Sequence, residues 1–216
     1  SGNPYSYDGG SEWYDLSGEG NNAAIQPGMT YSTDNKGVFN FSGAPDGYAQ
    51  IAPGFGYDYS AGVTVNVWAN FTTPVDPETE GNWERLIDFG NGAPANNIIL
   101  ARRYFTNNYV MDIEGTNGDS MEPVDPTINW DQWAMYTMWA DGTTWKLYKN
   151  GVFQSSESND ILPDSITRST NYIGKSLWPG DAMFLGSMSI VQLYNRALSD
   201  AEVYQNFNYA RRRYGL

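Results

Sequence analysis

The residues that could carry acid–base chemistry in this chain are its carboxylates, because the sequence contains no histidine. Histidine-dependent nucleophilic triads and histidine-ligated metals are therefore excluded. Asp112 and Glu114 stand two residues apart, so on a strand they would share one face, about 6.6–7 Å apart. Two solvated side chains on the polar face of a strand explain this pair equally simply. Glu84 and Asp88 flank Arg85, which a surface ion pair explains. We identify no catalytic residue.

A second group of residues could bind a ligand through an aromatic face and a nearby charge. Trp178 and Asp181 enclose Pro179-Gly180, and Pro followed by Gly favours a type II turn. Such a turn would hold an indole ring and a carboxylate at a loop tip, where they could recognise a sugar. The alternative is that Trp178 folds back as a lid on the core.

Arg102 and Tyr104 are a second candidate ligand-binding pair, because arginine can hydrogen-bond hydroxyl or carboxylate groups in a fork. Adjacent residues on a strand point to opposite faces, so at most one of Arg102 and Arg103 can serve a given site. Trp68, Trp139 and Trp145 lie inside expected strands, and we interpret them as core residues.

Composition narrows the class of partner. Lys and Arg number 12 against 25 Asp and Glu, which gives a formal net charge of −13. Such a chain repels nucleic-acid phosphates, so no nucleic-acid partner is expected. The apolar runs are shorter than the ~20 residues that a membrane helix requires, so no membrane insertion is expected. With no cysteine there is no disulfide framework.

The pattern of elements predicts an all-β domain of many short strands. Aromatic residues make up 15% of the chain and glycine occurs 23 times, as in a sandwich with frequent turns. Residues 135–153 contain Asp141-Gly142 and Asn150-Gly151 between alternating segments, which predicts a three-strand meander. One helix is expected over about 199–213, because Ser199 and Glu202 have capping-box spacing.

Two segments carry a family resemblance. Residues 13–22 and 38–48 form the front half, and residues 171–202, with Trp178-Pro-Gly and Tyr194-Asn-Arg-Ala-Leu-Ser199, form the back half. The chain resembles laminin-G-like, concanavalin-A-like jelly rolls over nearly its whole length. The resemblance implies one domain spanning residues 1–216, an antiparallel two-sheet sandwich with a short C-terminal helix. The ending around residues 206–215 also resembles laminin-G-like domains of phage and other virion surface proteins.

The resemblance also frames the cofactor and enzyme predictions. Glycoside hydrolases of this fold carry Glu-x-Asp-x-Glu motifs, and here Val110 replaces the first glutamate before Asp112 and Glu114. Related domains often bind calcium through an aspartate where this chain has Ser189, although Asp46 keeps the family pattern. No cofactor is predicted with certainty, and calcium stays an open alternative.

We therefore predict a non-catalytic module at an extracellular or virion surface that binds a glycan or cell-surface polysaccharide. Neighbouring virion or adhesin subunits are further candidate partners. A glycanase or lyase using Asp112 and Glu114, and a purely structural packing module, remain the alternatives. Fold alone does not decide among them.

Overall fold

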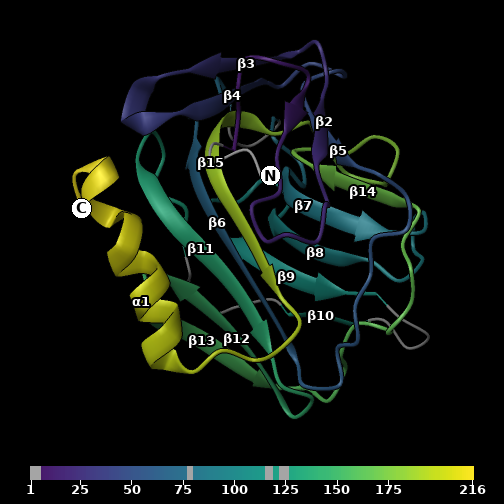
Figure 1. Cartoon of the computed structure of the whole chain (residues 1–216). Helices are drawn as coiled ribbons and strands as arrows, with labels where there is room; N and C mark the ends of the chain where they lie inside the picture. Colours follow the sequence, from purple (N-terminus) through teal and green to yellow (C-terminus); the bar gives the residue numbers. More distant parts are fainter. Residues whose placement is uncertain (1–5, 77–79, 115–118, 122–126) are drawn as a thin grey trace.

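The computed structural model describes residues 6–76, 80–114, 119–121 and 127–216, with the backbone alone for 119–121. Within these residues the chain forms two antiparallel sheets packed face to face, together with a C-terminal helix (Figure 1). In spatial order the eight-stranded sheet contains β1 (Glu12–Trp13), β2 (Ala23–Ile25), β5 (Ala49–Ile51), β14 (Thr170–Ile173), β7 (Arg85–Gly90), β8 (Ile98–Arg102), β9 (Tyr109–Ile113) and β10 (Asp119–Met121). The seven-stranded sheet contains β13 (Val152–Ser158), β12 (Thr144–Lys149), β11 (Trp133–Ala140), β6 (Val63–Phe71), β15 (Leu185–Tyr194), β4 (Val38–Ser42) and β3 (Met29–Ser32). The predicted jelly-roll sandwich is confirmed.

The main hydrophobic core lies between the two sheets and explains why valine occurs at every second position of β6. Val63, Val65 and Val67 on β6 are fully buried and belong to this core. The intervening residues of β6 are buried too, because its other face is covered by the helix. The meander is also confirmed, with β11 pairing antiparallel to β12 and β12 to β13.

Helix α1 (Asp200–Ala210) lies against the outer face of the seven-stranded sheet (Figure 1). The Ser199 hydroxyl accepts from the Glu202 amide, and the Glu202 carboxylate accepts from the Ser199 amide, so the capping box is confirmed. The indole of Trp68 stacks on Phe207 at 5.6 Å and on Tyr214 at 4.4 Å. The observed α-helix is shorter than the predicted one, because residues from Arg211 to Tyr214 form the 3₁₀ helix η2. A second 3₁₀ turn, η1 (Asp34–Lys36), links β3 to β4.

Strand β15 is only partly paired along one of its edges. Strand β6 pairs with it from Gly186 to Tyr194, whereas β4 pairs only from Leu185 to Met188. A bulge follows Met188, and Gly37 turns the chain away just before β4 begins. Among the described strands, none pairs with this edge of β15 over Ser189–Tyr194. The space between the sheets is therefore open along this edge.

Candidate functional site

The structure brings Trp178 and Asp181 together, as predicted, and joins them to Arg85. The Arg85 guanidinium donates to Asp181 at 3.1 Å and lies 5.3 Å from the Trp178 ring centre. On its other side it lies 5.4 Å from the ring of Trp83. Trp178 and Trp83 are half-buried and pack on a small apolar cluster on the outer face of the eight-stranded sheet, formed by Ile99, Ala101 and Val110. Trp178 thus caps this outer cluster, and its contact with a ligand stays a prediction.

Arg102 lies apart from that outer face and is completely buried. Its guanidinium donates to the Glu84 carboxylate at 3.0 Å and to the carbonyls of Glu80, Gly81 and Thr106. It also lies 4.8 Å from the ring of Trp130. These contacts cross-link the loop before β7 to β8 and are structural in character. Tyr104 is half exposed in a turn and contacts Phe105.

The predicted ion pair with Arg85 is confirmed for Asp88, at 3.6 Å, but the interpretation of Glu84 and Asp88 as surface residues is wrong. Both carboxylates are buried, and Glu84 pairs with Arg102 instead of Arg85. Burial raises the pKa of Glu84 to about 7, against the opposing hydrogen bonds from Leu185 and Arg102. Burial likewise raises the pKa of Asp88 to about 6, although Arg85 lies 3.6 Å away. The sequence did not predict the burial of these carboxylates, because segments that contact them, such as the one from Leu177 to Leu185, lie about 90–100 residues further along the chain.

The residues considered for catalysis and for calcium lie on different strands. Asp112 lies on β9 between the core residues Met111 and Ile113 and so faces the outer side of the eight-stranded sheet, and Glu114 directly follows this strand. Ser189, at the place of the family's aspartate, forms a hydrogen bond with the Tyr214 hydroxyl. Among the described residues, no group of three or more Asp or Glu side chains could hold a metal ion. The described helices include none long and apolar enough to cross a membrane.

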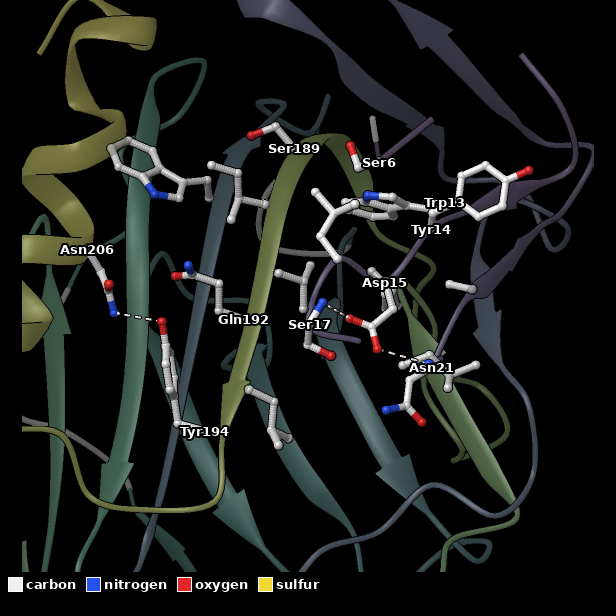
Figure 2. Close-up of a pocket in the computed structure, with 18 of the residues that line it drawn as sticks. Ser6, Trp13, Tyr14, Asp15, Ser17, Asn21, Ser189, Gln192, Tyr194 and Asn206 are labelled. Carbon is white, nitrogen blue, oxygen red and sulfur yellow. Dashed lines mark hydrogen bonds between the residues drawn. The ribbon is translucent and has the colours of Figure 1, made fainter. Parts of the chain in front are cut away.

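A cavity of about 550 Å³ opens where β15 lacks a partner strand (Figure 2). Strand β15 runs across it, with Asp15, Ser17 and Asn21 on one side and Gln192 and Tyr194 towards α1 (Figure 2). Its floor reaches the apolar space between the sheets and is lined by Ile51, Phe55, Phe89, Ile173, Val191 and Leu193. This volume falls within the range of roughly 300–1,000 Å³ that is typical of ligand-binding pockets.

One wall of the cavity is a polar loop that its own side chains hold in place. The Asp15 carboxylate accepts from the amides of Ser17, at 2.8 Å, and Asn21, at 2.9 Å. Gly18 and Gly20 have φ of +96° and +79°, which the loop needs to curl around the carboxylate. The Asn21 side-chain amide then donates to the Tyr57 hydroxyl at 2.7 Å. The loop therefore presents carboxylate, amide and hydroxyl groups at the mouth.

The opposite wall combines apolar and polar side chains from β15 and α1. Gln192 accepts from the side-chain amide of Asn66 at 3.2 Å, and the Tyr194 hydroxyl accepts from Asn206 at 3.2 Å. The sequence did not predict that these residues line a cavity. The edge of β15 is open only because β15 extends beyond the last residue that pairs with β4, and the sequence does not give the length of that pairing. The run Asp15-Leu-Ser-Gly-Glu-Gly-Asn21 did carry a signal, since it places glycines and polar side chains together.

Comparison with known proteins agrees with this architecture. The model of the concanavalin A-like lectin/glucanases superfamily matches residues 41–204, more than half of the chain, so the protein belongs to this superfamily. Among curated proteins, none has a sequence that matches this chain.

Three solved structures illustrate the likeness in fold. The binding domain of Paraclostridial Mosquitocidal Protein 1 superposes with a TM-score of 0.68 at 17% identity, over 91% of this chain and 49% of that one. The botulinum neurotoxin serotype G binding domain superposes with a TM-score of 0.70 at 16% identity, over 91% of this chain and 48% of that one. The Ruminococcus gnavus IT-sialidase CBM40 bound to α2,3-sialyllactose gives 0.56 at 18% identity, over 74% and 95%. The chain spans about half the length of the two toxin domains. At these identities the likeness is one of fold.

Proposed function

We propose that this chain is a non-catalytic attachment module that binds a glycan in the cavity beside β15. The observation that carries the proposal is the composition of that cavity, in which aromatic and aliphatic walls meet a rim of hydroxyl, amide and carboxylate groups. A sugar presents C–H faces that pack on apolar surface and hydroxyls that need hydrogen-bond partners. The cavity offers both within one concavity.

The nature of the structural neighbours supports a binding role. Two are described as binding domains of toxins, and the third was solved with a bound sialylated sugar. Their shared architecture makes attachment the favoured function, while the residues of the cavity argue for a sugar. We further propose that the module acts at an extracellular or virion surface as part of a larger structural or adhesive protein.

A cavity-blocking variant tests the proposal. Val191 lines the cavity and packs only partly against the core, so Val191→Phe should place a ring in the binding space. Val152→Phe is the matched control, because Val152 lies on β13, is 57% exposed and does not line the cavity. Both variants and the unmodified chain would be applied to a broad glycan array, and hits would be measured by calorimetry.

We expect the unmodified chain and Val152→Phe to bind the same glycans, and Val191→Phe to lose about tenfold or more in affinity. Overpacking costs about 1–3 kcal/mol, so circular dichroism must show that Val191→Phe is folded. Ser17→Trp provides a second block from an exposed position at the mouth. An array without hits would refute glycan binding, and oligomerisation of the same sample at micromolar concentration would favour the packing module. Release of sugar fragments that Asp112→Ala abolishes would establish the enzyme instead.

A further inference from the structure

The charge of the cavity indicates which class of glycan it selects. We propose, resting on the proposed function, that the cavity beside β15 accepts uncharged, hydroxyl-rich glycans and discriminates against sialylated, sulfated and uronic-acid-containing ones. The argument depends on two side chains at the cavity, Asp15 and Arg213, and on the charge of the whole chain.

Asp15 places a stable negative charge in the wall. Burial opposes ionisation, but hydrogen bonds from Ser17 and Asn21 outweigh it and lower the pKa of this carboxyl group. A carboxylate offers about four acceptor sites, and the amides of Ser17 and Asn21 occupy two of them. The side chains of Ser17 and Asn21 also interact with this carboxylate, and a sugar hydroxyl that replaced one of them would form a charge-assisted hydrogen bond, which is stronger than a neutral one. An acidic sugar brought to this place would meet a like charge.

The basic side chain at the cavity is already engaged by the protein. Of the lining residues that the structure describes, Arg213 is the only basic one. Its guanidinium donates to the backbone carbonyls of Asn35 and Gly37 and lies 5.5 Å from the ring of Tyr214. Lys36 lines a separate, smaller pocket of about 90 Å³. Arg213 keeps its positive charge, but its Nε and one terminal nitrogen are occupied in holding η2 against η1.

The surroundings act in the same direction. The chain carries a net charge of −13, so its field disfavours the approach of polyanionic glycans. A carboxylate or sulfate entering a partly apolar cavity also loses its hydration, and the cation there, Arg213, already donates to two backbone carbonyls. Neutral hydroxyls lose less hydration and find Asp15, Gln192 and the hydroxyl groups of the rim as partners.

The test compares matched pairs of oligosaccharides that differ only in an acidic group, with lactose and α2,3-sialyllactose among them. Binding of each pair would be measured by calorimetry at low and at high NaCl concentration, with the unmodified chain, Asp15→Asn and Asp160→Asn. Asp160→Asn is the matched control, because this substitution removes the same charge at an exposed residue that does not line the cavity. Melting temperatures would show whether the loop survives in Asp15→Asn.

We expect neutral members to bind about tenfold or more tightly than their acidic partners. Asp15→Asn should weaken the binding of the neutral members and reduce the ratio of neutral to acidic affinity several-fold. Asp160→Asn should leave both affinities unchanged. Added salt should narrow the ratio too, because it screens the repulsion. If the acidic members bind more tightly than the neutral ones, and Val191→Phe abolishes that binding, the proposed selectivity is overturned while glycan binding in the cavity still holds. Absence of any binding would overturn the proposed function itself.

Discussion

Arg102 offers the sharpest test of how this fold is held together, because the sequence predicts a ligand contact and the structure buries the side chain. Replacing it by Met keeps most of the apolar stem but removes the guanidinium. The Glu84 carboxylate then loses a 3.0 Å partner, and the carbonyls of Glu80, Gly81 and Thr106 lose their donor. Removing one partner of a buried ion pair costs about 3–5 kcal/mol, a large part of the ~5–15 kcal/mol that stabilises a typical domain.

Urea unfolding followed by tryptophan fluorescence and circular dichroism would measure this loss. Arg196→Met is the matched control, because Arg196 pairs with Glu202 at 2.7 Å at the surface, with side-chain exposures of 48% and 40%. Such exposed pairs contribute about 0–1 kcal/mol. The double variant Arg102→Met/Glu84→Gln leaves no buried charge, so it should be less destabilised than the sum of the single changes, by about 1–3 kcal/mol. If Arg102→Met unfolds at the same urea concentration as the unmodified chain, the structural role is refuted.

Two further predictions concern Glu84 and Trp178. Because burial raises the pKa of Glu84 from 4.5 to about 7, its contribution to stability is present below pH 4.5 and is lost as pH rises through 7. Relative to Glu84→Gln, the unmodified chain should therefore lose about 3 kcal/mol of unfolding free energy from pH 4.5 to above pH 7. A constant difference across that range would contradict this. Trp178→Ala should lower the melting temperature, because it uncovers Ile99, Ala101 and Val110, and should leave glycan affinity at the cavity unchanged. Lost glycan binding with an unchanged melting temperature would instead make Trp178 the ligand platform.

Local patterns in the sequence were enough to predict much of the fold. The Asp-Gly and Asn-Gly turns define the meander of β11, β12 and β13, because Gly142, Asn150 and Gly151 adopt positive φ at little cost. Ser199 and Glu202 define the start of α1, because capping involves groups only three residues apart. Trp68, Trp139 and Trp145 are buried as predicted.

Ion pairing and the position of the cavity could not be predicted in the same way. Arg85 pairs with Asp88 three residues away, but its shorter contact is with Asp181, 96 residues along the chain, and Glu84 accepts from the amide of Leu185. No short-range pattern specifies such contacts, so the polar spacing of Glu84, Arg85 and Asp88 suggested a surface. Arg85 lies beside the rings of Trp83 and Trp178, and the loop from Leu177 to Leu185 donates its terminal amides to Asp88 and Glu84.

The amino-acid sequence by itself determined the class of fold, the capped helix and the strongly acidic character of the chain. Strand alternation, turn chemistry and net charge are properties of neighbouring residues or of the whole composition. Only the tertiary structure decided that β15 extends beyond β4 and that the loop around Asp15 faces the exposed edge. Strand register and the spacing of two sheets depend on the packing of distant segments, and a cavity exists only where that packing is incomplete.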